Sequence, residues 1–127
     1  MKNAEYGPLL LRLSIGIMFI YQGIGKLMDP SGPAGMLTNL GFPAPQVFAW
    51  ILLLSEIIFG LAVLTGYKLK YTVWPLVLIF LVVIGTIILP AEELNVVTLF
   101  FHIIVIAGLI SLSLTGPGKL AIGKKIK

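Results

Sequence analysis

Residues 47–65 read VFAWILLLSEIIFGLAVLT, an apolar stretch in which Glu56 is the single charged side chain. At about 1.5 Å of rise per residue, a helix of this length crosses the hydrocarbon core of a bilayer. Three further apolar runs of similar length occupy residues 8–27, 71–89 and 97–115. The sequence therefore predicts an all-α membrane protein, a four-transmembrane-helix bundle forming a single membrane domain over residues 1–127.

The composition agrees with this class. Of the 127 residues, 58% are hydrophobic and 11% are charged, which leaves too little polar surface for a water-soluble domain. The chain has no cysteine, which excludes a disulfide framework and any thiolate-bound metal or iron–sulfur cluster. We expect the first helix to be retained and not cleaved as a signal peptide, because its apolar run is long and Arg12 and Lys26 interrupt it.

Basic residues are distributed unequally about the four runs. Lys2, Arg12, Lys68, Lys70 and the tail 119–127 lie on one side, whereas the loops on the other side begin next to Lys26 and contain no other base. By the positive-inside rule this pattern predicts that both termini are cytoplasmic. It also explains the net charge of +4 through topology, with membrane lipid as the partner and no nucleic acid. We expect the basic tail to attract anionic lipid.

The longest connection, residues 28–46, is rich in proline and glycine. It contains the segments Pro30-Ser31-Gly32-Pro33 and Gly41-Phe42-Pro43. Such residues favour turns over regular helix. The sequence predicts ordered turns here, or a short re-entrant piece against the outer leaflet.

Four ionisable side chains fall within the predicted helices: Arg12, Lys26, Glu56 and His102. A charge near the bilayer centre costs about 2.5–3.5 kcal/mol on insertion scales, so each of them needs a partner or a function. Axial rise places Arg12 and Glu56 about 7–8 Å apart in depth. We therefore predict an intramembrane ion pair between Arg12 and Glu56. This pair is a structural clamp on one interpretation, whereas on the other Glu56 exchanges protons or binds a ligand.

Three further polar residues are candidates for interhelical or ligand contacts. His102 lies on a helical stripe with Thr98 and Ser113 that is predicted to face the bundle, and Gln22 has a similar depth, so a contact between Gln22 and His102 is expected. Lys26 stands beside Asp29 and is predicted to pair locally or to anchor an anionic or carbonyl-bearing ligand. A single histidine without cysteine predicts no metal or haem site within one chain.

Glycines mark one face of the first helix. Arg12, Gly16, Phe19, Gly23 and Lys26 share that face at helical spacing. Two small residues on one face favour close packing against another helix.

The order of several short motifs resembles a known family. The motifs are Leu10-Leu11-Arg12-Leu13, Gln22-Gly23-Ile24-Gly25-Lys26-Leu27, Gly41-Phe42-Pro43-Ala44, Glu56 with Gly60, Leu64-Thr65-Gly66, and Gly116-Pro117-Gly118-Lys119-Leu120. In this order the chain resembles the DoxX/DoxD-like family of small four-helix integral membrane proteins. The family pattern often has His where Gln22 stands, and another His near the end of the third helix, where this chain has none.

The resemblance implies a redox context. DoxD-like members resemble the membrane subunit of thiosulfate:quinone oxidoreductase, and other DoxX-like proteins resemble membrane partners of redox-defence enzymes. We therefore expect an accessory subunit of a quinone-linked or respiratory-type complex in a prokaryotic plasma membrane, not catalytic alone and without its own redox centre.

We expect no cofactor to be bound by this chain alone and no metal; quinone is the candidate ligand, with Gln22, Lys26 and His102 as candidate contacts. We expect other membrane subunits or further copies of the chain as partners. The alternatives are a purely structural or assembly subunit and a small proton or solute transporter.

Overall fold

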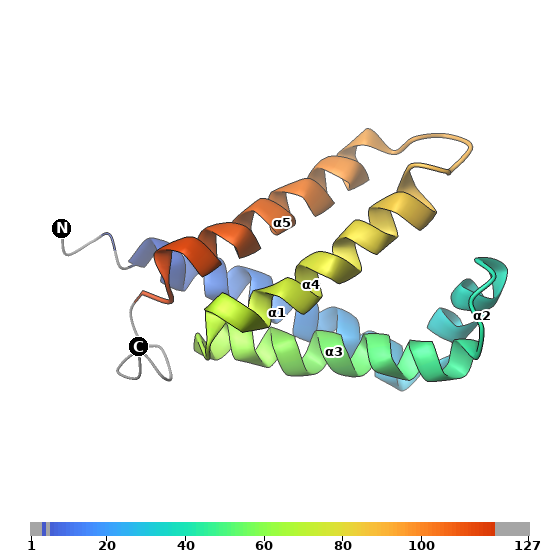
Figure 1. Ribbon diagram of the computed structural model, residues 1–127, viewed down its shortest axis with the longest axis horizontal. Helices are drawn as coiled ribbons and strands as arrows, with labels where there is room; N and C mark the ends of the chain where they lie inside the picture. The colour runs from blue at the N-terminus through green and yellow to red at the C-terminus, as the bar shows by residue number, and fades with distance from the viewer. Residues whose placement is uncertain (1–3, 5, 119–127) are drawn as a thin grey trace.

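The computed structural model describes residues 4 and 6–118, and this part of the chain is helical and contains no strand. Its elements are α1 (Tyr6–Met28), α2 (Ser31–Asn39), α3 (Pro45–Thr65), α4 (Leu69–Val83), a π-helix (Ile84–Ile88) that continues α4, and α5 (Val96–Thr115) (Figure 1). Four helices are long and apolar enough to cross a membrane: α1, α3, α4 with its π-helix, and α5. The predicted all-α fold with four transmembrane helices is confirmed. Lys2 and the basic tail lie outside the described residues.

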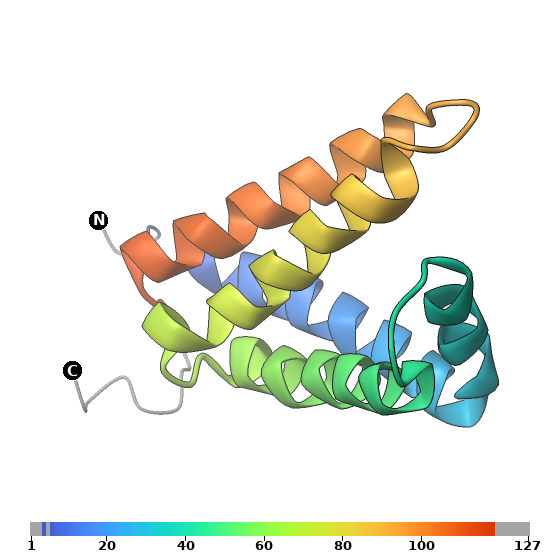
Figure 2. The same ribbon diagram turned by 45° about the vertical axis from the view of Figure 1, so that its right-hand side comes forward.

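The helices form two antiparallel pairs that diverge toward one end of the molecule. The start of α1, the end of α5 and the turn between α3 and α4 lie together at one end, which we call the turn end (Figure 1). The opposite end, which we call the α2 end, carries α2 and the loop 89–95. Figure 2 shows that the α4–α5 pair leans away from the α1–α3 pair toward the α2 end.

Glycines let α1 and α3 pack with their backbones almost in contact. A Cβ atom added to Gly16 would lie 2.8 Å from the Cα of Leu64, and one added to Gly60 would lie 3.1 Å from the Cβ of Phe19. At Gly23 the added atom would lie 3.1 Å from the backbone nitrogen of Ile57. The predicted glycine face of the first helix is therefore the face that contacts α3, and small residues permit this approach between membrane helices.

The hydrophobic core lies in the half of the bundle toward the turn end. Its buried members come from all four long helices and include Ile15, Phe19, Val63, Val73, Leu76, Phe80, Leu109 and Leu112. On the side facing the α2 end, the core ends at a row of three rings, those of Phe19, Phe80 and His102, which we call the aromatic row. The ring centroids of Phe19 and Phe80 are 4.9 Å apart, and those of Phe80 and His102 are 4.4 Å apart. The four long helices are therefore packed tightly only on one side of this row.

Two local elements differ from the prediction or extend it. The connection predicted as turns or a re-entrant piece contains the regular helix α2. Pro33 lies in its first turn, where a missing N–H leaves no hydrogen bond unmade, so proline does not prevent a helix there. The π-helix at the end of the third span was not predicted. Within it, the hydroxyl of Thr86 donates to the Val82 carbonyl oxygen over 2.7 Å.

The α1–α3 contact leads to a first prediction. Gly16→Ala should destabilise the protein by about 1–3 kcal/mol, because the new methyl group would overlap the Leu64 backbone and force the helices apart. Gly25→Ala is the matched control, since it lies on the same helix with open space around it, and should change stability by no more than about 0.5 kcal/mol. Thermal unfolding of both variants in detergent measures the difference. Equal stabilities would show that the glycine contact does not hold α1 against α3.

Candidate functional site

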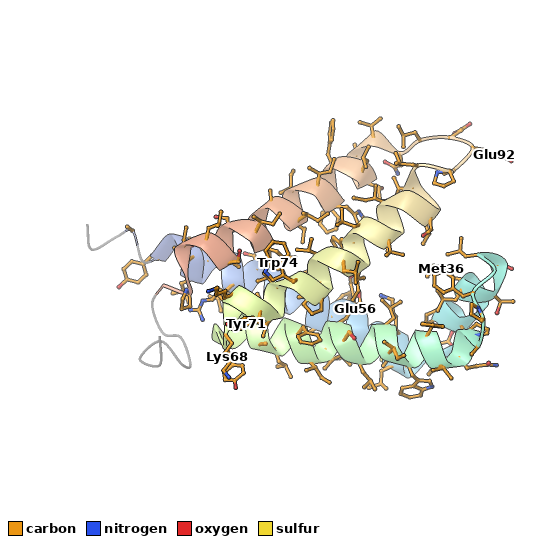
Figure 3. All side chains as sticks on the ribbon, in the orientation of Figure 1. Met36, Glu56, Lys68, Tyr71, Trp74 and Glu92 are labelled. Atoms are coloured by element: carbon orange, nitrogen blue, oxygen red, sulfur yellow. The ribbon has the colours of Figure 1, made fainter. Side chains whose placement is uncertain are left out.

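The centre of the site is an ion pair between Lys26 and Glu56. The Nζ atom of Lys26, in the last turn of α1, lies 2.6 Å from Oε1 of Glu56, which is near the middle of α3 (Figure 3). The Glu56 side chain is 2% exposed, whereas that of Lys26 is 26% exposed. A carboxylate buried at this depth requires a partner, and the ammonium group of Lys26 supplies it.

This pairing corrects the predicted ion pair between Arg12 and Glu56. Arg12 is fully buried, and its Nη1 atom donates to the carbonyl oxygen of Leu64 over 3.3 Å at the C-terminal end of α3, where a cation complements the helix dipole. Axial rise gives the depth of Arg12 and of Glu56 along their own helices, but it does not give the register between the two helices. Glycine packing instead places Gly16 beside Leu64, so Arg12 reaches only the last turn of α3 while Lys26 reaches back to Glu56.

The local pairing predicted between Lys26 and Asp29 is also replaced. Asp29 accepts a hydrogen bond from the hydroxyl of Ser31, two residues further along the chain. The carboxylate of Asp29 thereby supports the turn between α1 and α2. Lys26 is left to join α1 to α3.

His102 binds within its own helix and does not contact Gln22 through a hydrogen bond. Its Nδ1 atom lies 2.8 Å from the carbonyl oxygen of Thr98. Since a carbonyl only accepts, Nδ1 carries a proton in this contact, which leaves Nε2 outside it. The half-buried amide of Gln22 makes no hydrogen bond to any residue within the described part of the chain. The predicted contact between Gln22 and His102 is therefore not made through a hydrogen bond, although the stripe of α5 that carries His102 does face inward.

Four of the predicted site residues nevertheless occupy one region. On α1, Phe19, Gln22 and Lys26 follow one another at helical spacing, so Gln22 and Lys26 lie beyond the aromatic row on its α2 side. Glu56 joins this region through Lys26, and His102 borders it through its ring contact with Phe80. We call Gln22, Lys26, Glu56 and His102 the interior polar residues. Arg12 is not one of them, because it lies at the turn end.

An apolar cleft opens next to this region, between α2, α3 and α4. Its volume is about 290 Å³, and its walls include Leu37 of α2, Leu52 and Ser55 of α3, and Ile79 and Val83 of α4. Ser55 and Thr86 supply the two polar side chains of the lining, and none of the lining residues is charged. The sequence does not reveal this cleft, because side chains facing a cleft and side chains facing lipid are equally apolar.

Comparison with known proteins now identifies the family. The DoxX family model matches residues 7–91. The chain belongs to the DoxX family. In an alignment 127 positions long, it is 22% identical to the inner membrane protein YphA of Escherichia coli (strain K12), and the alignment covers 92% of this chain and 88% of that protein. No solved structure matches the chain. Family membership confirms the resemblance inferred from the motifs, and with four apolar helices it makes this DoxX protein an integral plasma membrane protein.

The ion pair leads to a second prediction. Removing one partner of a buried ion pair costs about 3–5 kcal/mol, and because Lys26 is partly exposed we expect Lys26→Met to cost about 3 kcal/mol. The double variant Lys26→Met/Glu56→Gln should recover part of this loss, since it leaves no unpaired carboxylate in the bundle. Unfolding of the single and double variants in a double-mutant cycle measures the coupling. Strictly additive effects would contradict an energetic link between Lys26 and Glu56.

Proposed function

We propose that this DoxX protein is an integral membrane accessory subunit of a quinone-linked redox complex and carries no redox centre of its own. The observation that carries the proposal is the polar region around the Lys26–Glu56 pair, set beside an apolar cleft within the bundle. A quinone requires both parts: an apolar space for its ring and tail, and a few polar groups for its oxygens.

The interior polar residues suit the chemistry of a quinone and its quinol. The ammonium group of Lys26 and the amide of Gln22 donate to a quinone carbonyl, whereas Nε2 of neutral His102 accepts from a quinol hydroxyl. Glu56 is already bound to Lys26, and we assign proton transfer to it: as the partner supplies electrons and the quinone is reduced to the quinol, Glu56 would pass a proton to the quinone oxygen and be reprotonated afterwards. These roles assign binding and proton transfer to this chain.

Electron transfer is assigned to a partner. The chain has no cysteine, and no three His, Asp or Glu side chains gather as metal ligands within residues 4 and 6–118. A redox cofactor would therefore be held by another subunit, with this chain presenting the quinone to it. If the DoxD-like resemblance extends to function, this chain would correspond to the membrane subunit of a thiosulfate:quinone oxidoreductase.

We further propose that the turn end faces the cytoplasm. Arg12, Lys68 and Lys70 lie toward that end, whereas Asp29, Glu92 and Glu93 lie toward the α2 end. The positive-inside rule assigns the basic end to the cytoplasm. The cleft would then open in the outer half of the membrane.

This orientation gives a third prediction. Because the chain has no cysteine of its own, a single introduced cysteine is the only site that a maleimide can label. In intact cells, a membrane-impermeant maleimide should label Glu92→Cys and leave Lys68→Cys unlabelled, whereas both should react after the membrane is permeabilised. Labelling is read by mass shift, and the unsubstituted chain is the control for background. Labelling of Lys68→Cys alone in intact cells would reverse the proposed orientation.

The quinone-linked role gives a fourth prediction. Gentle detergent extraction from native membrane, followed by native mass spectrometry, should recover the chain with a redox-active partner and with quinone. Glu56→Gln should lower quinone reduction by that complex by at least about a hundredfold, in the range of lost acid–base catalysis. Glu92→Gln in the exposed loop is the control and should leave the rate unchanged.

Two outcomes would contradict the proposal. A partner complex that holds no quinone and reduces none would remove its basis. A complex that assembles and turns over normally with Glu56→Gln would favour the structural or assembly role instead.

A further inference from the structure

The Lys26–Glu56 pair gives its two partners unequal access to the surroundings. Glu56 lies near the middle of the bundle (Figure 3), and its side chain is 2% exposed, whereas that of Lys26 is 26% exposed. Lys26 belongs to the last turn of α1, which ends at Met28, so its exposed part lies toward the α2 end. Among the residues that the structure describes, Lys26 is the one side chain that makes a hydrogen bond to Glu56.

The interior on the other side of Glu56 is apolar. The hydrophobic core lies between the ion pair and the turn end, and its fully buried members include Phe19, Val63, Leu76, Leu109 and Leu112. Between α1 and α3, Gly60 follows Glu56 by one helical turn and packs closely against Phe19 and Ile20. The space between these two helices is therefore closed directly below the carboxylate.

The polar groups buried near the turn end do not continue from Glu56. Besides Glu56, the buried polar or charged side chains of the described chain are Arg12 and Thr72. Arg12 donates to the Leu64 carbonyl oxygen over 3.3 Å, and the Thr72 hydroxyl donates to the Tyr67 carbonyl oxygen over 3.0 Å. Leu64 lies about 12 Å from Glu56 along the axis of α3. Proton transfer requires groups about 2.6–3.2 Å apart, directly or through one water, so this apolar segment interrupts a route to the turn end.

The other titratable groups on the surrounding helices do not bridge this gap. His102 of α5 belongs to the aromatic row, at the border of the polar region. Lys70 and Tyr71 are exposed in the first turn of α4, at the turn end, and α2 contains no titratable residue. On α1, Tyr21 is exposed and Arg12 lies at the turn end. Lys26 is thus the titratable group in contact with Glu56.

We propose that Glu56 exchanges its proton with the α2 end alone, and that Lys26 relays it. To protonate Glu56, the Nζ–H bond of Lys26 breaks and its proton crosses the 2.6 Å contact to Oε1. The neutral amine then takes a proton from water at the α2 end, and deprotonation follows the same steps in reverse. The inference rests on the proton role that the proposed function gives to Glu56, and it names the residue and the side through which the proton moves.

One-sided exchange has two consequences for the function. A quinone reduced next to Glu56 would draw its protons from the α2 side, which is the outer side in the proposed orientation. A carboxylate that communicates with one side does not carry protons across the membrane. The inference therefore speaks against the alternative of a small proton transporter.

The side of exchange is tested with the full-length protein in liposomes whose internal pH is held by trapped buffer. The external pH is lowered rapidly, and protonation of Glu56 is followed by infrared spectroscopy through the carboxyl band that Glu56→Gln removes. Impermeant maleimide on Glu92→Cys measures the share of chains with the α2 end outward. In two preparations that differ in this share, the fraction of Glu56 that responds should equal it.

The relay is tested by Lys26→Arg. Arginine keeps the positive charge beside Glu56, but its guanidinium does not give up a proton in proteins. This variant should retain the thermal stability of the wild type and slow the protonation of Glu56 by at least about tenfold. Lys68→Arg makes the same change at an exposed lysine at the turn end and should leave the rate unchanged.

Each outcome supports or overturns the inference. A response that equals the share of chains with the turn end outward, or that is complete in both preparations, would overturn one-sided exchange. The absence of any response would overturn it as well, since Glu56 would then exchange no proton. A wild-type rate in Lys26→Arg would show that water reaches Glu56 without the relay.

These measurements use no quinone, so they separate the inference from the proposed function. If Glu56 is protonated from the turn end, the route fails and the quinone-linked role stands. If exchange is one-sided but the native complex holds no quinone, the proposed function fails and the route stands.

Discussion

Close packing of α1 against α3 determines most of the interior architecture of this DoxX protein. In lipid there is no hydrophobic driving force between helices, so contact area and close backbone approach decide which helices associate. Gly16 and Gly60 provide that approach: a side chain at Gly16 would overlap the Leu64 backbone, and one at Gly60 would fit only if Phe19 and Ile20 shifted slightly. The contact fixes the register of the two helices, and the register in turn decides that Glu56 meets Lys26 and that Arg12 meets the end of α3.

The same packing divides the bundle into two unlike halves. Toward the turn end, apolar side chains from all four long helices form a continuous core. Beyond the aromatic row of Phe19, Phe80 and His102, the α4–α5 pair leans away, and polar side chains and a cleft occupy the interior. Stability and the candidate site are thus assigned to different halves of one small bundle.

The sequence predicts the fold well because its signal is simple. Apolar runs of about 20 residues have few structural alternatives, so the four helices and the glycine face of α1 could be inferred directly. The partner of Glu56 could not, because depth along a helix does not determine the register between two helices. The cleft could not be predicted either, since Leu52 and Val83 have the same apolar character as residues that face lipid. Family motifs pointed correctly to DoxX, yet the role of each polar side chain depends on contacts that motifs do not encode.

The connections between helices have a mechanical consequence. Short links join α2 to both α1 and α3, and the Lys26–Glu56 pair joins α1 to α3 directly, so these three helices form one connected frame. The α4–α5 hairpin is joined to that frame through the chain only at the turn after α3, where Gly66 adopts a left-handed conformation with φ of 77°. A tilt of the hairpin about this hinge would separate Phe19 from Phe80 and widen the cleft in a single movement. Such a tilt would therefore change the access to the polar interior and the width of the cleft together, because the α4–α5 hairpin borders both.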